Sequence, residues 1–245
     1  MKTTEEYMQD LRKWLADTAQ APLEEMSAFF SKRIDGYEEH MSFWESSYRC
    51  FSDLLPDSCE NILDLGCGTG LELDKIWQKN PRLAVTGIDL CSDMLDMLQK
   101  KHPDKRLTAI CQDYFQYDFG VGKWDAVISF ESLHHFLPDR KKELYQKIYR
   151  SLANDGTFLS GDYIACCEEE ETLLRDTCLK KRQEAAIPDD RFVHFDIPLT
   201  LAHELELLRD AGFSIEKVTD DSEEATIIVA KKTMTPSTQR LPAAL

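Results

Sequence analysis

Apolar and polar positions follow two periods along the chain, and their order predicts an α/β fold. Short apolar runs that suit buried strands alternate with segments of helical spacing. The predicted strands cover residues 62–65, 83–88, 107–111, 124–130, 157–160, 213–219 and 225–231. The last two are joined by only a few residues, which predicts an antiparallel hairpin. Strands that alternate with helices favour right-handed parallel crossovers. We therefore predict a seven-stranded, mostly parallel sheet with a C-terminal antiparallel hairpin and helices on both faces.

A long stretch of mainly helical pattern precedes the first strand. Thr3 and Glu6 fit a capping box for a first helix, and Pro22 suits the first turn of a second helix. We expect residues 1–55 to form an N-terminal helical cap. Its aromatic side chains either pack on the sheet or close over a ligand. The candidates for such a lid or substrate wall are Tyr37, His40 and Trp44.

The alternation of strands and helices is interrupted after the fifth predicted strand. Residues 163–200 form an insertion in a main domain that we expect to span 56–232. The acidic run Glu168–Glu171 opens a helix there, and we interpret it as a solvent-exposed helix start, since acids suit a helix N-terminus. Residues 233–245 contain two prolines and no periodicity, so we expect a disordered tail.

Composition and charge narrow the classes of function. The chain has 245 residues, of which 42% are hydrophobic, enough for a substantial core. Its 29 basic and 45 acidic residues give a net charge of −16, which argues against a nucleic-acid partner because phosphates attract basic surfaces. No apolar run is long enough to span a membrane, and the polar N-terminus does not resemble a signal peptide.

The eight cysteines form no C-x-x-C pair. We interpret them as reduced thiols and expect a cytoplasmic protein. Cys166 and Cys167 could bind a metal ion together with histidines, but adjacent cysteines are not the usual spacing of metal ligands, so we expect no metal site.

The strongest chemical signal is Asn61–Leu71, which reads Asn-Ile-Leu-Asp-Leu-Gly-Cys-Gly-Thr-Gly-Leu. A strand, a glycine turn and a helix in this order make a nucleotide-type cofactor site. The glycine spacing is G-x-G-x-G rather than the G-x-G-x-x-G of dinucleotide sites. Asp64 is poorly placed beside a pyrophosphate but well placed beside an ammonium group. This favours S-adenosylmethionine, and an NAD-type oxidoreductase stays as an alternative that rests on the generic sheet.

Acids also end the next two predicted strands. Asp89 can accept hydrogen bonds from both ribose hydroxyls, which suits either cofactor. Asp113 can accept a hydrogen bond from an adenine amino group, with Gln112 or Tyr114 beside it. Because the carboxyl ends of parallel strands meet at one edge of a sheet, we expect these residues to complete the site that Asp64 begins.

With these residues in place, the chain resembles the class I S-adenosylmethionine-dependent methyltransferases, and in particular their small-molecule branch. The matching motifs lie at 62–70, 86–89 with 92–95, 112–113, 124–129 with 133–136, and 152–157. The resemblance implies a Rossmann-like fold, S-adenosyl-L-methionine as cofactor and S-adenosyl-L-homocysteine as product. A second likeness, to the carboxy-S-adenosylmethionine synthases of tRNA modification, lies in the overall layout.

The resemblance also assigns roles to residues. Asp64 and the glycines would hold the methionine part of the cofactor, Asp89 the ribose, and Asp113 with Tyr114 the adenine. Either Glu131 or Ser132 would face the cofactor near its methyl group. The cofactor-binding candidates are Asp64, Gly66, Cys67, Gly68, Gly70, Asp89, Leu90, Met94, Gln112, Asp113, Tyr114 and Glu131.

The reaction we expect is in-line displacement of the methyl group onto a small-molecule acceptor. The sulfonium already activates the methyl group, so the enzyme mainly aligns the acceptor and excludes water. If the acceptor must lose a proton, the candidate bases are His134, His135 and His194. Alternatives are a carboxy-S-adenosylmethionine synthase-like enzyme and a non-catalytic regulatory protein that binds S-adenosylmethionine. We expect a monomer or a homodimer.

Overall fold

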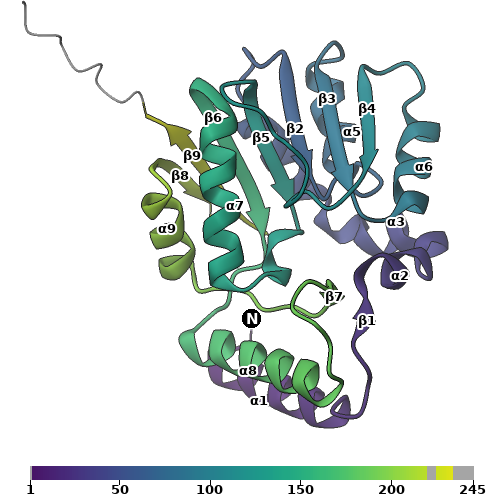
Figure 1. Ribbon diagram of the computed structural model, residues 1–245, viewed down its shortest axis with the longest axis vertical. Coiled ribbons are helices and arrows are strands. Elements are labelled where there is room, and N and C mark those ends of the chain that lie inside the picture. The colour runs from purple at the N-terminus through teal and green to yellow at the C-terminus, as the bar shows by residue number, and fades with distance from the viewer. Residues whose placement is uncertain (1, 220–224, 234–245) are drawn as a thin grey trace, which may run out of the picture.

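A computed structural model describes residues 2–219 and 225–233 of the chain. Its main sheet has seven strands in the order β4-β3-β2-β5-β6-β9-β8 (Figure 1). The strands are β2 (Asn61–Leu65), β3 (Ala84–Asp89), β4 (Leu107–Cys111), β5 (Trp124–Phe130), β6 (Leu152–Asp162), β8 (Phe213–Thr219) and β9 (Thr226–Lys232). The first five are parallel, and β9 is antiparallel to both β6 and β8. The predicted sheet and hairpin are therefore confirmed, while the turn residues 220–222 lie outside the described residues.

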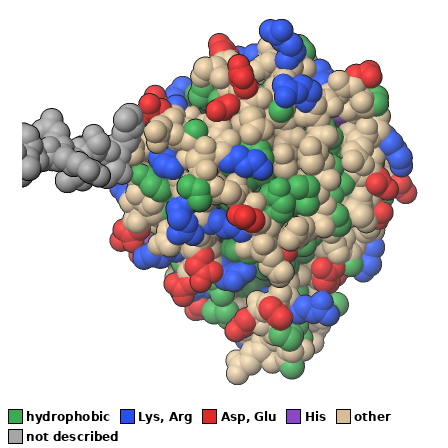
Figure 2. Space-filling model, turned by 45° about the horizontal axis from the view of Figure 1, so that its top comes forward, with side chains coloured by type: hydrophobic (Ala, Val, Ile, Leu, Met, Phe, Trp, Pro, Cys, Tyr) green, Lys and Arg blue, Asp and Glu red, His purple; other side chains and the backbone are tan. Residues whose placement is uncertain are grey.

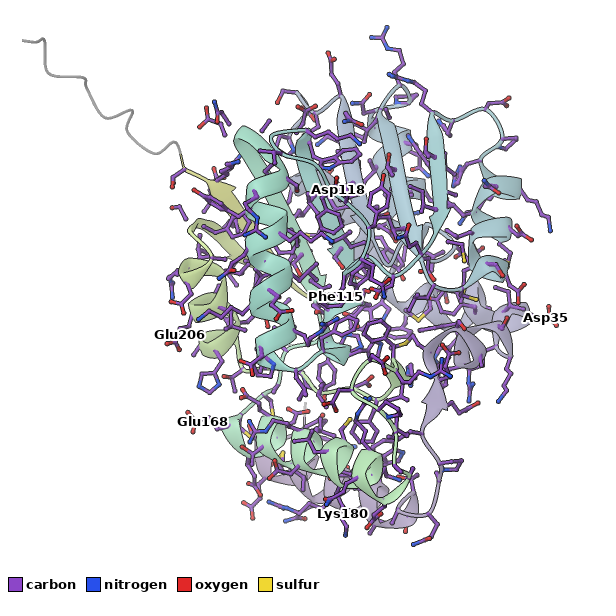
Figure 3. The ribbon with its side chains drawn as sticks, viewed as in Figure 1. Asp35, Phe115, Asp118, Glu168, Lys180 and Glu206 are labelled. Atoms are coloured by element: carbon purple, nitrogen blue, oxygen red, sulfur yellow. The ribbon has the colours of Figure 1, made fainter. Side chains whose placement is uncertain are left out.

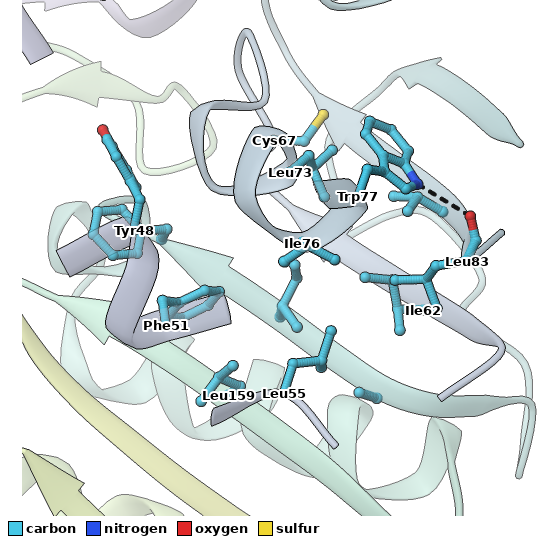
Figure 4. Packing of buried hydrophobic residues seen from close by; sticks show 14 of the residues in the cluster. Tyr48, Phe51, Leu55, Ile62, Cys67, Leu73, Ile76, Trp77, Leu83 and Leu159 are labelled. Carbon is cyan, nitrogen blue, oxygen red and sulfur yellow. Dashed lines mark hydrogen bonds between the residues drawn. The ribbon is translucent and has the colours of Figure 1, made fainter. Parts of the chain in front are cut away.

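Helices cover both faces of this sheet. One face packs against α4 (Glu45–Leu54), α5 (Leu71–Lys79) and α6 (Ser92–Lys101), and Figure 4 shows part of that core, with the Trp77 indole donating to the Leu83 carbonyl at 3.1 Å. The other face packs against α7 (Pro138–Ser151) and α9 (Leu201–Asp210), which a buried Lys141–Glu204 ion pair of 2.6 Å joins. Both faces are thus sealed, and the carboxyl edge of the parallel strands is left for a ligand.

The N-terminal segment differs from its prediction after the first helix. α1 (Thr4–Asp17) begins with the expected capping box between Thr3 and Glu6. The second helix does not start at Pro22: Glu24–Glu25 instead forms a short strand, β1, antiparallel to β7 (Val193–His194). The Glu25 side chain caps α2 by accepting from the Ala28 N–H at 2.9 Å. Pairing with a segment far along the chain therefore moved the helix start.

The remaining N-terminal elements are short. They are α2 (Met26–Ser31), the 3₁₀ turn η1 (Ile34–Gly36), α3 (Tyr37–His40) and the 3₁₀ turn η2 (Met41–Trp44), which leads into α4. A further 3₁₀ turn, η3 (Leu133–His135), follows β5. These turns lie near the carboxyl edge of the sheet, where they can close over a site.

α1 lies beside α8 (Glu168–Glu184), beyond the carboxyl ends of the parallel strands (Figure 1). Figure 3 labels Glu168 and Lys180 near opposite ends of α8. The Lys181 ammonium holds the C-terminal end of α1 by donating to the carbonyls of Thr18, Ala19 and Ala21 at 2.8–3.0 Å. The N-terminal segment and the insertion thus pack together on the same side of the sheet.

The interpretation of the acidic run as a solvent-exposed helix start is wrong for two of its four residues. Glu170 is fully buried and accepts hydrogen bonds from the hydroxyls of Tyr7 and Tyr163, while Glu171 accepts from the Thr200 N–H at 2.7 Å. Glu169 remains exposed and pairs with Arg12. The start of α8 is therefore an attachment point for α1 and α9. The pattern of charges along the sequence does not reveal this role.

One face of the protein surface carries charged side chains of both signs. On the face drawn in Figure 2, basic and acidic side chains are interspersed and neither sign forms a continuous area. Among the described residues, no helix has the length and apolar character needed to cross a membrane. All eight cysteines lie in the described part of the chain and are free thiols, as expected. The predicted tail falls almost wholly outside the described residues, which end at Thr233.

Candidate active site

The glycine turn after β2 is built for close approach of a ligand. Gly66 has φ of 74°, and a Cβ there would lie 2.1 Å from the Ser132 Oγ, so a side chain does not fit. Gly68 has φ of 47°, but the nearest atom to a Cβ would be the Tyr37 hydroxyl at 3.9 Å. Gly66 therefore allows the turn to pack closely against the segment that follows the neighbouring strand β5, whereas Gly68 borders open space.

Asp89, at the end of β3, fixes this turn. One carboxylate oxygen accepts from the Gly68 N–H at 2.9 Å and the other from the Cys91 N–H at 2.8 Å. Burial raises the pKa of Asp89, although the backbone N–H groups oppose the shift. The Asp89 carboxylate thus joins the segments that follow the neighbouring strands β2 and β3. Asp89 also lines a cavity at this edge of the sheet.

A cavity lies at this edge, and we call it the glycine-turn cavity. The cofactor candidates that line it are Gly66, Gly68, Asp89, Leu90, Met94, Tyr114 and Glu131. Met26, Ser27 and Phe30 of the α2 segment also line it, and the sequence interpretation missed them as site residues. Their only signal was an apolar helical stripe, which equally suits packing on the sheet.

Five cofactor candidates lie outside this lining: Asp64, Cys67, Gly70, Gln112 and Asp113. The Cys67 side chain is buried, and a Cβ at Gly87 would lie 2.7 Å from its sulfur. Gln112 is exposed, and Asp113 accepts from the Phe115 N–H at 2.8 Å, which shapes the loop after β4. The structure therefore gives these residues supporting positions around the cavity.

Asp64 is fully buried beneath the turn, and neither of its oxygens has a hydrogen-bond donor among the described residues. Burial and the neighbouring Glu72 carboxylate raise its pKa well above the usual range. Burial likewise raises the pKa of Glu72 to about 7. Glu72, which the sequence interpretation missed, lines a smaller cavity together with Cys67 and Gly70. A buried pair of acids without a cation suits a ligand that carries an ammonium group.

A second cavity adjoins the first, and we call it the histidine cavity. It brings together every lid and catalytic candidate of the sequence analysis: Tyr37, His40, Trp44, His134, His135 and His194. The two cavities share Phe30, Tyr37, Glu131 and His135. These shared residues therefore mark the boundary at which two ligands could meet.

Glu131 lies at the centre of that boundary. It follows β5 with φ of 49°, a left-handed conformation that is uncommon for a residue other than glycine. Its N–H donates to the Gly161 carbonyl at 2.8 Å, which holds the backbone there. Burial raises the pKa of Glu131 to about 8, although nearby His134 opposes the shift. A strained residue at a cavity boundary is a common feature of functional sites.

The three histidines have different environments. Burial disfavours the charged form of His134, but Asp162 and Asp196 outweigh it and hold its pKa well above the usual value. Burial and the charge of His134 lower the pKa of His135 well below it. Burial also lowers the pKa of His194, whose ring stacks on Phe29. Only His135 lines both cavities.

A third cavity extends the histidine cavity between α1, α8 and β1, and we call it the cap cavity. The two share Phe29, Arg33, Tyr163, His194 and Asp196.

Phe115, labelled in Figure 3, stacks with Phe192, and both rings contact Phe136. Aromatic contacts thus join the loop after β4 to the segment before β7.

Comparisons with known proteins agree with this geometry. Residues 62–156 match the model of a methyltransferase domain. The carboxy-S-adenosyl-L-methionine synthase of Nautilia profundicola is 27% identical over 222 residues, covering 85% of this chain and 93% of that protein. The malonyl-(acyl-carrier protein) O-methyltransferase of Priestia megaterium is 32% identical over 108 residues, or 42% of this chain and 36% of that protein.

Residues 62–156 are thus a methyltransferase domain of the class I S-adenosylmethionine-dependent type. Among solved structures, a putative O-methyltransferase of Nostoc punctiforme superposes on this chain with a TM-score of 0.62 at 22% identity. The superposition covers 80% of this chain and 59% of that chain. A chain from the complex of a putative Haloferax volcanii methyltransferase with the Trm112 activator gives a TM-score of 0.63 at 18% identity, over 85% and 99%. These likenesses confirm the Rossmann-like fold, and the family's cofactor is S-adenosylmethionine.

Proposed function

We propose that this methyltransferase binds S-adenosylmethionine in the glycine-turn cavity and methylates a small molecule held in the histidine cavity. The observation that carries the proposal is the shared boundary of the two cavities at Phe30, Tyr37, Glu131 and His135. A cofactor and an acceptor placed on either side of this boundary would meet inside the protein, away from bulk water.

The residues around the glycine turn fit the cofactor. Asp89 offers carboxylate oxygens to a ribose, and Tyr114 offers a buried ring beside Asp113 for the adenine. Asp64 and Glu72 form the acidic pair that an ammonium group would neutralise. None of the residues named here offers a cation to a pyrophosphate, so this arrangement favours S-adenosylmethionine over NAD.

The bound cofactor supplies an electrophilic methyl group on a sulfonium. The chain's own contribution is alignment and exclusion of water. Phe30 and Tyr37 cover the boundary from the N-terminal segment, and Phe136 closes the glycine-turn cavity from the sheet side. Of the three histidines, His135 is the one that can act on an acceptor beside the cofactor, because its side chain lines both cavities.

The cap cavity indicates the shape of the acceptor. Leu11, Trp14, Leu23 and Leu174 line it, so it offers an apolar continuation of the histidine cavity. Arg33, which lines both, lies 3.6 Å from the centre of the Phe29 ring and pairs with Glu24 at 3.0 Å. The acceptor we infer has its reacting atom near His135 and an extended apolar part toward α1 and α8.

Transfer of a carboxyl-bearing group is the second candidate, favoured by the Nautilia profundicola relative, whose matched region covers 93% of that synthase. A carboxylate in the histidine cavity would face Asp196, while Arg33 is already paired with Glu24 and His134 is already held between Asp162 and Asp196. Like charges in a partly buried site are unfavourable. The lining of the histidine cavity therefore favours methyl transfer.

Turnover with mass spectrometry of both products tests this proposal. The protein is incubated with S-adenosylmethionine and a panel of hydroxylated or amino compounds that carry apolar tails, and in parallel with a panel of carboxylic acids as carboxyl donors. The expected result is S-adenosylhomocysteine together with an acceptor that has gained one methyl group. A cofactor that gains a carboxyl group would instead assign the synthase activity, and binding without any turnover would support a regulatory protein.

A further inference from the structure

Two imidazoles and three carboxylates converge at the boundary of the cavities. His134 and His135 come from η3, Asp162 from the end of β6, and Asp196 from the segment between β7 and α9. The ligand atoms of His134, His135 and Asp196 lie within 4.8 Å of one another, and those of Glu131, His134 and Asp162 do so as well. The cluster could not be read from sequence spacing, because its members come from four separate segments.

His134 is held in the orientation of a metal-bound histidine. Its Nδ1 lies 2.6 Å from an Asp162 oxygen, and its Nε2 lies 3.5 Å from an Asp196 oxygen. In the neutral ring with Nδ1–H donating to Asp162, the lone pair of Nε2 points toward Asp196, so an ion bound there would displace the second ring proton. A carboxylate that accepts from the outer ring nitrogen is the usual support for an imidazole ligand. Asp162 is itself fixed, being 5% exposed and accepting from the Tyr163 N–H at 3.1 Å.

The basic partners of the Glu131, Asp162 and Asp196 carboxylates within the cluster are histidines, and each carboxylate keeps one buried oxygen free of a hydrogen bond within the described residues. The Asp196 oxygen lies between the two imidazoles, 3.3 Å from the His135 Nδ1. Buried, unpartnered carboxylate oxygens are costly, and a cation among them would remove that cost.

We propose that His134, His135 and Asp196 bind one divalent transition-metal ion, with Asp162 as the residue that orients His134. Two imidazoles and one carboxylate with further positions open suit ions such as Zn²⁺ or Fe²⁺ rather than Mg²⁺. The expectation of no metal site considered the adjacent cysteines, whereas the ligands here are histidines and an aspartate.

The position of the ion suggests its use. His135 lines both cavities, so an open coordination position there would face the acceptor. A bound ion would hold an acceptor oxygen beside the cofactor and favour its anionic form. This role rests on the proposed function, whereas the binding of the ion does not. On this account the acceptor class narrows to molecules with a hydroxyl group near one end.

Metal titration of the chelator-treated full chain tests the site. Calorimetry with Zn²⁺, and visible absorption with Co²⁺, should show one ion per chain with nitrogen and oxygen ligands. Asp196→Asn should remove most of the affinity, and Asp162→Asn should weaken it by about 10- to 100-fold. The matched control is Asp74→Asn, which removes a carboxylate 2.7 Å from the His102 ring but lies outside the cluster, and should leave the affinity unchanged.

The same variants are checked for thermal unfolding and for S-adenosylhomocysteine binding, which separates loss of the ion from loss of the fold. Absence of stoichiometric binding by the wild type, or equal binding by Asp196→Asn, would overturn the metal site. Cofactor binding and turnover that persist in that case would leave the proposed function intact. Metal binding without turnover would instead remove the proposed function and keep the site.

Discussion

The two sides of the candidate active site are built in different ways. The glycine-turn cavity is formed mostly by residues that directly follow β2 to β5, such as Gly68, Asp89 and Glu131. The histidine cavity depends on segments far apart in the sequence, which the β1–β7 pairing and the α1–α8 contact bring together. The difference implies that cofactor binding depends on local backbone geometry, whereas the acceptor side depends on long-range packing.

The largest effect on cofactor binding is expected from a substitution of Asp89. Asp89→Ala removes two charge-assisted hydrogen bonds to the turn, each contributing roughly 1.5–3 kcal/mol. We expect the affinity for S-adenosylhomocysteine in calorimetry to fall about 100-fold or more. The control is Asp118→Ala, which removes a carboxylate that accepts from the Gly120 N–H at 2.9 Å outside the cavities. Similar affinities of the two variants would show that Asp89 does not organise the cofactor site.

A smaller effect is expected on the cap side, at Glu170. Glu170→Gln removes the charge that holds the Tyr7 and Tyr163 hydroxyls, which should lower the free energy of unfolding by about 1–3 kcal/mol. Glu169→Gln, the next residue in the same acidic run, removes an exposed pair with Arg12 and should leave stability unchanged. Urea denaturation measures both. Faster amide exchange in α1 should accompany the first variant only, and equal effects would contradict an attachment through Glu170.

The smallest expected effect is a pH dependence of cofactor affinity. Because burial raises the pKa of Glu72 to about 7, the folded protein without ligand keeps this carboxyl protonated at lower pH. An ammonium group favours the ionised form, so binding must release the proton and should strengthen as pH rises from about 6 to 8, by roughly 10-fold at most per pH unit. Calorimetry in buffers of different ionisation enthalpy measures the released proton. A Glu72→Gln variant with the same pH profile would contradict this role.

Local sequence patterns explain why the residues of the cofactor side meet, whereas they do not explain the meeting of the acceptor-side residues. The strand, the glycine turn and Asp89 are local features, so G-x-G-x-G and the acids at strand ends predicted their meeting. Glu72 was missed because an acid in the first turn of a helix is usually explained by the helix dipole.

On the cap side, a local pattern gave the wrong element. Pro22 predicted a helix start, but β7 pairs with Glu24–Glu25 instead. The candidates His135 and His194 share one cavity although 59 positions separate them in the chain. Local sequence patterns carry no information on contacts between distant segments. The histidine cluster and the burial of Glu170 are therefore visible in the fold alone.

A crystal structure with S-adenosylhomocysteine bound tests most directly whether the two cavities hold cofactor and acceptor. We predict the adenosine in the glycine-turn cavity with its ribose against Asp89, and the sulfur at the boundary formed by Glu131 and His135, open to the histidine cavity. A sulfur directed away from that boundary, or an adenosine that fills the histidine cavity, would contradict the account.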